Sequence, residues 1–380
     1  MNGNSTMTAS YAHLLIDARP LNGTRNGIAR FVEQLVRAWP AVCRARVTLI
    51  SNRPVVTATP LPASLNVWID HPVWRRCPGS LWLTLRGPMI AQRLRATHML
   101  GTQHVLPLRS LRGVHLAVIV HDLVFRKFPA TMLWSDRLIS GAFVPSSLRR
   151  ADSIFCISES TRQDLLSEFV LPHERVRVAY PGTTFDRVAT ERVVAAAPPV
   201  RLLAVGSIEP RKNLERLLRA YLLLRRQGHP LQLELVSGYA WGNALSPELQ
   251  RAIAAEPSVK ISTRVDDEQL KRLYAEADFL VFPSLYEGFG LPLLEAIGRC
   301  SAIANDIPVF REIANHMAGI RLMDFSSDVA AVATQLSRNL GPARVCGFRD
   351  EAAVELFSWR HCALVMAQQM GLASEPGDSL

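Results

Sequence analysis

Short apolar runs alternate with longer segments of helical spacing along most of the chain, and this alternation limits the fold more than any other feature. A parallel strand returns to its sheet through a long crossover connection, which a helix supplies. Runs that are apolar at nearly every position indicate strands that are covered on both faces. We therefore predict an α/β fold of two doubly wound, Rossmann-like domains, with ligands at the carboxyl ends of their strands.

The alternation occurs on both sides of an alanine-rich stretch, residues 188–200, which we interpret as a linker between domains at 12–187 and 200–355. In the first half, strands are predicted at 13–17, 47–50, 66–69, 116–120, 153–157 and 175–179, and helices at 28–39, 130–150 and 160–168. In the second half, strands are predicted at 201–205, 231–236, 259–262, 279–282 and 302–304, and helices at 213–226, 268–275 and from 291.

Composition excludes several classes of protein. The 380 residues are 48 % hydrophobic and 20 % charged, which is typical of globular proteins and not of disordered or fibrous ones. No apolar run reaches the ~18 residues of a membrane-spanning helix, and the first ten residues lack the features of a secretory signal. The six cysteines are scattered and form no CxxC pair, so we expect a reducing, cytoplasmic location.

The excess of positive over negative charge is confined to the first half of the chain. Residues 1–190 contain 23 basic and 11 acidic residues, whereas residues 191–380 contain 20 and 22. A basic half attracts nucleic acid, an anionic membrane surface or a phosphorylated substrate. No recognition helix, zinc finger or aromatic platform accompanies the charge, so a nucleic-acid partner is not favoured.

The stretch 74–95 contains five arginines and no acidic residue, interleaved with tryptophan, leucine and methionine. This pattern predicts docking on an anionic membrane surface, and an ordinary arginine-rich surface is the alternative. Gly79, Gly87 and Pro88 argue against a single continuous helix in this stretch.

One candidate site follows the predicted strand 201–205. Ser207 and Pro210 mark a turn, and Arg211 and Lys212 lead into a helix that is expected to be capped near Asn213. Two cations beside the amide groups of a helix start suit a diphosphate. A plain strand–turn–helix with a solvated Arg-Lys pair is the alternative.

A second candidate site follows the predicted strand 279–282. Glu287 precedes Gly288-Phe289-Gly290, where glycines let a ligand approach the backbone amides, and Pro292 suits the first turn of a helix. Glu295 lies eight residues after Glu287, which is about 12 Å on a continuous helix. The two carboxylates would then contact different parts of an extended ligand, such as two sugars joined by a diphosphate. The alternative is that both are ordinary helix carboxylates.

Two further candidates lie in the first half. His121 and Asp122 follow the strand 116–120, where α/β proteins bind ligands; a structural histidine is the alternative, and Asp122 either orients the imidazole or caps the turn. Gly23 and Gly27 precede a helix without the GxGxxG spacing of dinucleotide-binding proteins.

Several catalytic signatures are absent from the sequence: a P-loop, a GxSxG elbow, an HExxH motif and any Asp-x-Asp pair. We therefore expect no metal or cofactor. The charge on a diphosphate would be met by Arg211, Lys212 and the amides of a helix start instead of Mg²⁺.

Together these motifs resemble family-4 retaining glycosyltransferases of the GT-B fold. The resemblance rests on Glu-Pro-Arg-Lys-Asn at 209–213, Pro-Ser-Leu-Tyr-Glu-Gly-Phe-Gly-Leu-Pro-Leu-Leu-Glu at 283–295, His-Asp-Leu at 121–123, Ile-Asp-Ala-Arg-Pro at 16–20 and Gly-Ile-Ala-Arg at 27–30. It extends from about residue 12 to about residue 330. It also implies that a C-terminal helix within 356–372 packs back on the N-terminal domain, which binds the acceptor, while the C-terminal domain binds the nucleotide-sugar.

The resemblance assigns roles to these residues. Glu287 would hold hydroxyls of the donor sugar, Glu295 the nucleotide ribose, and Arg211 and Lys212 the diphosphate. The rest of the implied donor site comprises Ser207, Gly288, Phe289, Gly290 and Leu291, of which the last three contribute amides to sugar and phosphate.

The first half would complete the site. His121 would hydrogen-bond the donor sugar near its reacting carbon, and Gly27 and Asp122 would line the acceptor and phosphate side. The residues with implied catalytic roles are Glu287, His121, Arg211 and Lys212.

The reaction implied by the resemblance is transfer of a hexose with retained configuration, in which the departing diphosphate oxygen deprotonates the acceptor hydroxyl. The start at 17–20 together with His-Asp-Leu-Val-Phe-Arg-Lys-Phe-Pro at 121–129 resembles bacterial mannosyltransferases of polysaccharide assembly. These use GDP-mannose and lipid-linked or saccharide acceptors. From these acceptors together with the basic stretch 74–95, we expect peripheral contact with the cytoplasmic face of the inner membrane. The alternatives are a UDP-sugar donor, a nucleotide-sugar epimerase or phosphorylase, an inactive relative and a basic nucleic-acid-binding protein.

Overall fold

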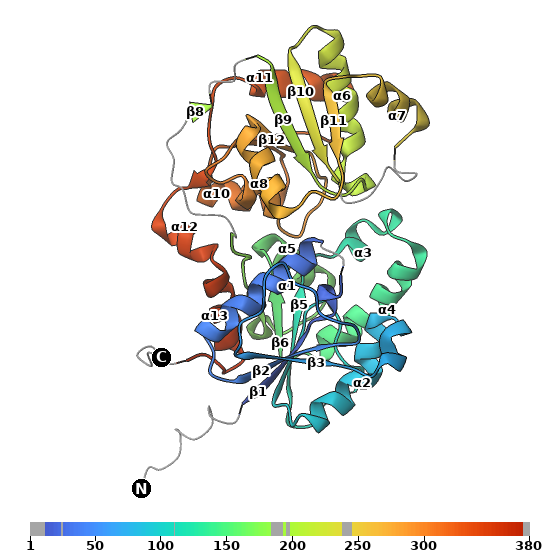
Figure 1. The fold of residues 1–380 in the computed structure, drawn as a ribbon, viewed down its shortest axis with the longest axis vertical. Coiled ribbons are helices and arrows are strands. Elements are labelled where there is room, and N and C mark those ends of the chain that lie inside the picture. Colours follow the sequence, from blue (N-terminus) through green and yellow to red (C-terminus); the bar gives the residue numbers. More distant parts are fainter. Residues whose placement is uncertain are drawn as a thin grey trace. The chain divides into compact units, whose positions relative to one another are not determined.

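The computed structural model describes residues 12–23, 26–109, 111–183, 193–194, 198–237 and 245–374. The chain divides into two compact units, Met1–Gly182 with Leu356–Leu380, and Thr183–Glu355 (Figure 1). The first ten residues and most of the predicted linker 188–200 lie outside the described residues.

The first unit contains a parallel sheet with the strand order β3-β2-β1-β4-β5-β6-β7. Its strands are β1 (His13–Asp17), β2 (Arg46–Ser51), β3 (Leu65–Ile69), β4 (His98–Gly101), β5 (His115–Val120), β6 (Ser153–Cys156) and β7 (Val176–Val178). The predicted parallel, doubly wound sheet is confirmed. β4 was not predicted, because its four residues begin with a histidine and are too short to show alternation.

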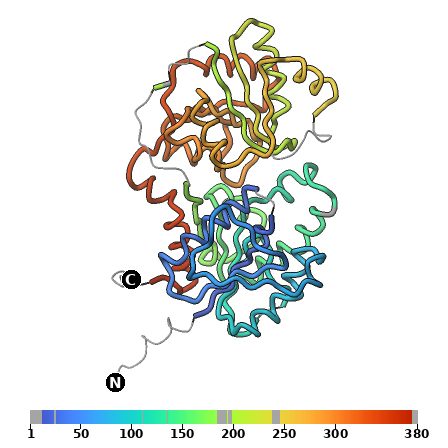
Figure 2. Tube along the Cα trace, in the orientation of Figure 1, coloured from blue at the N-terminus to red at the C-terminus, as the bar shows by residue number. Residues whose placement is uncertain are grey.

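Helices cover the sheet of the first unit. They are α1 (Gly27–Ala38), α2 (Gly79–Arg93), α3 (Val124–Lys127), α4 (Trp134–Arg150), α5 (Glu159–Glu168) and α13 (Trp359–Gln369). α2 and α4 share one apolar core with the strands. α13 packs on α1, where the rings of Phe31 and Trp359 lie 5.2 Å apart, and Figure 2 shows this late segment of the chain beside the early one.

As predicted, the basic stretch is not one continuous helix: the 3-10 helix η4 (Pro72–Arg76) ends before α2 begins at Gly79. The expectation that Gly87 and Pro88 interrupt a helix is wrong, because α2 continues through both to Arg93. Gly79 is its first residue, and Pro88 lies inside it. Gly87 fits because a Cβ there would lie 2.9 Å from Pro107 Cγ, so the glycine lets the helix approach that loop closely. Burial of Trp82, Leu83 and Ile90 outweighs the low helix propensity.

The second unit contains a parallel sheet with the order β11-β10-β9-β12-β13-β15. Its strands are β9 (Val200–Val205), β10 (Leu231–Val236), β11 (Val259–Ser262), β12 (Phe279–Phe282), β13 (Ser301–Asn305) and β15 (Ile320–Met323). Its helices are α6 (Leu214–Arg226), α7 (Pro247–Ala254), α8 (Asp267–Glu276), α9 (Leu291–Glu295), α10 (Pro308–His316), α11 (Val329–Asn339) and α12 (Glu351–Leu356).

Two short antiparallel pairs accompany this sheet. β14 (Met317–Ala318) pairs with β17 (Gly347–Phe348), and β8 (Val193–Val194) pairs with β16 (Ala343–Arg344). β8 lies within the predicted linker 188–200, where its two β-branched residues find a partner strand that is remote in sequence.

In both units the strand order reverses next to the first strand, between β1 and β4 and between β9 and β12. Loops diverge at such a reversal, which opens a ligand-binding crevice at the carboxyl ends of the strands. The candidate residues follow β1 and β5 in one unit and β9 and β12 in the other. In the described part of the chain, no helix combines the length and apolar character needed to cross a membrane.

Candidate functional site

The loops after β9 and β12 are joined at the reversal of the second sheet. The Leu285 amide donates to the Arg211 carbonyl at 2.8 Å. Asn213 Nδ2 donates to the carbonyls of Pro283, at 3.3 Å, and Phe325, at 2.9 Å. Asn213 has a left-handed backbone, φ 55°, and its side chain makes no cap hydrogen bond at the start of α6. Asn213 is therefore the N-cap residue of α6, as predicted, but its side chain does not cap the helix. It hydrogen-bonds to the loops after β12 and β15 instead.

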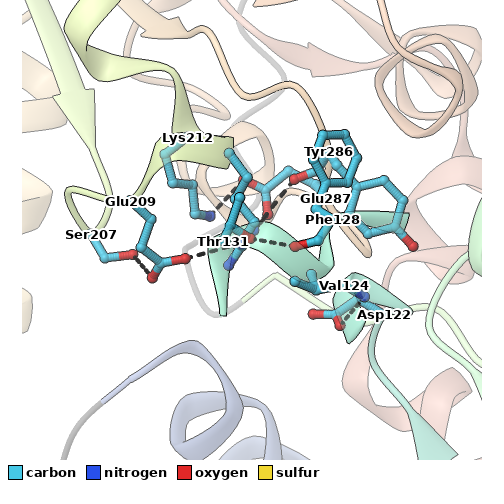
Figure 3. A network of polar contacts seen from close by, with 10 residues as sticks. Asp122, Val124, Phe128, Thr131, Ser207, Glu209, Lys212, Tyr286 and Glu287 are labelled. Carbon is cyan, nitrogen blue, oxygen red and sulfur yellow. Dashed lines mark hydrogen bonds and ion pairs between the residues drawn. The ribbon is translucent and has the colours of Figure 1, made fainter. Parts of the chain in front are cut away.

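Two cations and two carboxylates form one cluster here (Figure 3). Lys212 Nζ lies 2.5 Å from Glu287 Oε1, and Arg211 Nη1 lies 3.4 Å from Glu287 Oε2. Arg211 Nε also pairs with Glu209 Oε2 at 3.0 Å. Ser207 Oγ donates to the other oxygen of Glu209 at 2.5 Å. The cluster thus holds Arg211 and Lys212 side by side, and its formal charges balance.

Three side chains of this cluster are largely buried, and the fourth is exposed to solvent. Lys212 and Arg211 are each 15 % exposed and Glu287 is 10 % exposed, whereas Glu209 is 41 % exposed. Because interactions between charges strengthen as water is excluded, the contacts of Lys212 and Glu287 are stronger than those of a surface ion pair. An incoming anion would compete with the carboxylates for these two cations.

The glycine-containing loop leads into α9. Gly288 and Phe289 are buried, and Gly290 is the N-cap of α9 with φ 135°. A Cβ at Gly290 would lie 2.8 Å from Phe310 Cε1, so both the backbone conformation and the packing require glycine there. Leu291 and Pro292 are the first residues of α9, as the position of the proline predicted.

Glu287 and Glu295 do not lie on one helix, so the predicted helical separation of these carboxylates is wrong. Glu287 lies in the loop, and α9 begins only at Leu291, after the left-handed Gly290. Glu295 ends α9, is 8 % exposed, and accepts a hydrogen bond from Tyr274 Oη at 2.8 Å. Tyr274 lies on α8 and is completely buried.

The first unit carries the remaining candidates at the carboxyl edge of its own sheet. Gly27 is the first residue of α1, with Asn26 as the cap whose side chain accepts from the Ala29 amide at 2.9 Å. Nothing lies within 4 Å of a Cβ built at Gly27. Glycine is therefore not required there by the folded protein itself.

The Asp-Ala-Arg-Pro start that supported the resemblance forms an internal ion pair. Arg19 Nε and Nη2 donate to the two oxygens of Asp17 at 2.7 and 2.6 Å, and both side chains are almost completely buried. The backbone amide of Arg19 also donates to Asp17. This pair stabilises the turn after β1 with no net charge.

His121 is buried at the end of β5. Its Nε2 lies 2.8 Å from the Thr102 carbonyl, its amide donates to His104 Nε2 at 3.0 Å, and its ring meets Phe31 edge-on at 5.0 Å. Burial and, after it, the neighbouring His104 lower the pKa of His121 from 6.5 to about 4. The imidazole is therefore neutral at pH 7. It accepts or donates hydrogen bonds but carries no positive charge.

Asp122 caps the turn that follows. Its Oδ1 accepts from the Val124 amide at 3.1 Å (Figure 3), and its charge raises the pKa of His121 and His104 against the larger effect of burial. Of the two predicted roles of Asp122, the structure shows turn capping.

Sequence reasoning missed four residues that hold the candidates in place. Glu209 binds Ser207 and Arg211, Tyr274 binds Glu295, and Thr102 and His104 bind His121. Only Glu209 had a local signal, its place within the Glu-Pro-Arg-Lys-Asn motif. The other three contacts join segments that are far apart in the sequence.

Comparison with protein families gives two matches that divide the chain. Residues 25–187 match the model "Glycosyltransferase Family 4", and residues 190–338 match "Glycosyl transferases group 1". The first match contains Gly27, His121 and Asp122, and the second contains the Arg211–Lys212–Glu287 cluster and Glu295.

Curated relatives and solved structures agree with these matches. The O-antigen chain mannosyltransferase B of Escherichia coli is 31 % identical over 57 % of this chain and 59 % of its own length. The serotype-specific mannosyltransferase WbdA of E. coli is 29 % identical over 60 % of this chain and 31 % of its own length. The matched part thus spans less than two thirds of these relatives. Sucrose-phosphate synthase of Thermosynechococcus elongatus has the same fold, with a TM-score of 0.63 and 20 % identity over 94 % of this chain and 98 % of that one.

Proposed function

The chain belongs to the glycosyltransferases that combine a Family 4 domain with a group 1 domain in the GT-B fold, and we propose that it transfers a hexose from a nucleotide-sugar to a saccharide or lipid-linked acceptor. The observation that carries this proposal is the pairing of Arg211 and Lys212 with Glu287 at the sheet reversal of the group 1 domain. Parallel-sheet domains bind nucleotides at this position.

Arg211 and Lys212 bind the diphosphate of the donor. A diphosphate offers more negative charge and more acceptor oxygens than a carboxylate, so it displaces Glu287 from part of its contact with Lys212. Glu287 is then available for hydroxyls of the sugar ring. The cations stabilise the negative charge that develops on the leaving diphosphate, which needs no metal ion.

Glu295 binds the ribose, with its carboxylate oriented by Tyr274. His121, neutral at pH 7, hydrogen-bonds a hydroxyl of the sugar. Gly27 leaves room beside the start of α1 for the acceptor and phosphate side of the site. The remaining donor contacts come from Ser207, Gly288 and the amides of Phe289, Gly290 and Leu291.

The transfer proceeds with retention of configuration. The bond between the anomeric carbon and the diphosphate oxygen breaks, and the acceptor oxygen bonds to the same face of that carbon. The departing diphosphate oxygen takes the proton of the acceptor hydroxyl, so that no protein base is needed.

We propose mannose from GDP-mannose as the donor and cell-surface polysaccharide as the product. The two E. coli relatives are mannosyltransferases, which supports the sugar. Thermal-shift measurements with GDP-mannose, GDP, UDP-glucose and UDP-N-acetylglucosamine test the donor. Stabilisation by GDP-mannose and GDP alone is expected, and selective stabilisation by the UDP compounds would refute the GDP assignment. Conversion of the nucleotide-sugar without an acceptor would instead identify an epimerase.

We further propose that α2 contacts the anionic cytoplasmic face of the inner membrane. Leu81, Leu85 and Met89 recur every four residues on α2 and are 42 %, 51 % and 56 % exposed. Four arginines of the same stretch are also exposed, at or beyond the two ends of α2: Arg75, Arg76, Arg93 and Arg95. An exposed apolar stripe on a helix with exposed arginines at its ends suits the interface of an anionic bilayer.

Vesicle sedimentation tests the membrane contact. Binding to phosphatidylglycerol vesicles at low salt should fall with added salt, and Leu85→Ser should weaken it by about tenfold because apolar burial is lost. Val170→Ser is the matched control, since Val170 is fully exposed outside the stripe. Equal binding of wild type and Leu85→Ser, or no binding at low salt, would refute the contact.

A further inference from the structure

A second histidine adjoins His121 in the first unit. His104 follows β4, the strand next to β5, and its ring stacks on that of His121 with centroids 5.5 Å apart and planes 21° apart. The backbone of His104 is left-handed, with φ 62°, which is uncommon for a residue other than glycine. Its amide donates to the Ile119 carbonyl at 3.2 Å, so both its backbone and its ring bind the end of β5.

The hydrogen bonds define where the ring protons lie. The His121 amide donates to His104 Nε2, so this nitrogen carries a lone pair and the proton of the neutral His104 ring is on Nδ1. His121 Nε2 faces the Thr102 carbonyl at 2.8 Å, and because a carbonyl only accepts, the proton of the neutral His121 ring is on Nε2. The two stacked rings are therefore opposite tautomers.

Thr102, whose carbonyl contacts His121, is itself held in place by a hydrogen bond to β1. The Thr102 hydroxyl donates to the Asp17 carbonyl at 2.7 Å, and Thr102 is completely buried. The carbonyl that His121 contacts is thus tied to β1, next to the turn that leads to Gly27. Nδ1 of His121 is left as the acceptor nitrogen of the ring.

We propose that His104 is a positioning residue for His121: it binds the His121 amide and, with Thr102, orients the imidazole so that Nδ1 accepts a hydrogen bond from a hydroxyl of the donor sugar. The identity of the ligand, a sugar hydroxyl, rests on the proposed function. The orientation of His121 rests only on the hydrogen bonds described above. Among the described residues, the titratable groups that act on the pair are the two rings themselves and Asp122.

Electrostatics supports a neutral pair. Burial lowers the pKa of both histidines, and the neighbouring His104 lowers the pKa of His121 further. A proton on His104 Nε2 would also remove the acceptor of the His121 amide. The strained backbone of His104 persists because its ring and its amide both gain hydrogen bonds to β5, and such strain is typical of functional sites.

Nitrogen NMR of the wild-type rings at pH 7 is the first test and needs neither donor nor acceptor. We expect His104 protonated on Nδ1 and His121 protonated on Nε2. The opposite tautomer of either ring, or a positively charged ring at this pH, would overturn the proposal whether or not the protein transfers a sugar.

Two substitutions of His104 form the second test. His104→Met fills a similar volume and offers only a weak acceptor, its thioether sulfur. The His121 ring should then be held less firmly against the Thr102 carbonyl, so that its tautomers mix, and kcat/KM for the donor should fall about tenfold, as expected for one lost hydrogen bond. His104→Gln places an acceptor oxygen at a similar reach and should restore both readouts. A His121 spectrum and kcat/KM unchanged in His104→Met would overturn the proposal.

The chain offers a matched control. His98 and His115 stack at 5.5 Å with planes 29° apart at the amino ends of the same two strands, β4 and β5. His115→Gln should leave the His121 tautomer and kcat/KM at wild-type values. If His104→Met does not fold, His104→Gln decides: a loss of the Nε2–H tautomer of His121 in that variant would overturn the role of the acceptor.

Discussion

Replacement of Lys212 by alanine tests the phosphate-binding cluster most directly. Lys212 Nζ lies 2.5 Å from Glu287 Oε1, and these side chains are 15 % and 10 % exposed. Two unit charges about 4 Å apart attract by ~4 kcal/mol at an effective dielectric constant of ~20. Lys212→Ala removes one of the two cations that stabilise the negative charge developing on the diphosphate. The lost stabilisation is therefore of this order, less the part that Arg211 still supplies. We therefore expect kcat/KM to fall by at least ~10²-fold.

The assay measures steady-state release of the nucleoside diphosphate and, separately, GDP binding by titration calorimetry. Lys271→Ala is the matched control: Lys271 pairs with Glu268 at 2.7 Å, but on the surface of α8, where such a pair contributes ~1 kcal/mol or less. Turnover of Lys212→Ala within about threefold of wild type would refute our placement of the site.

Glu287→Ala separates the sugar-binding role from the phosphate-binding role. Removal of this carboxylate frees both cations of a competitor, so GDP should bind at least as tightly as it does to wild type. The hydroxyl contacts of the sugar are lost, and kcat/KM should fall by at least ~10²-fold. A parallel loss of GDP affinity and turnover in this variant would contradict the competition between carboxylate and phosphate.

Three further outcomes follow from the packing and the ionisation of the site. Tyr274→Phe removes the hydrogen bond to Glu295. It should lower the free energy of unfolding, measured in urea, by ~1 kcal/mol and weaken GDP binding. An unchanged GDP affinity would show that Glu295 does not bind the nucleotide. Gly290→Ala should cost at least ~2 kcal/mol, because its φ is 135° and its Cβ would lie 2.8 Å from Phe310; a stability equal to wild type would be inconsistent with this packing. His121 has a folded-state pKa of about 4 against 6.5, so the unfolded state binds more protons between these values, and stability should fall as pH drops from 6.5 toward 4, by roughly 1 kcal/mol per pH unit. His121→Gln should flatten this dependence, and an equally steep profile in the variant would assign it to other groups.

Most helices and strands could be predicted because their signals are local. The start of α8 is an example: Asp266 and Gln269 form a capping box, and the apolar positions that follow keep helical spacing. β4 and α2 could not be predicted in this way. β4 exists because β1 and β5 flank it on both sides, and α2 exists because burial of Trp82, Leu83 and Ile90 outweighs its low helix propensity.

The candidate site likewise has features that could be predicted from the sequence and features that depend on the tertiary structure. Arg211, Lys212 and Glu287 were recognisable from motif spacing, but their pairing depends on the adjacency of β9 and β12. The separation inferred for Glu287 and Glu295 was wrong because a left-handed glycine ends the loop before the helix starts. The backbone conformation of Gly290 alone thus places Glu287 outside the helix that contains Glu295.

By itself the sequence determined the class of fold and the residue types that can bind a phosphorylated sugar, because hydrophobic period and motif spacing act over a few neighbouring residues. Only the tertiary structure decided which groups hold those residues: Tyr274 against Glu295, and Thr102 and His104 against His121. The order of strands in each sheet brings these partners together, and the same burial sets the ionisation of His121. Neither the strand order nor the loss of water around a side chain is encoded in a short stretch of chain.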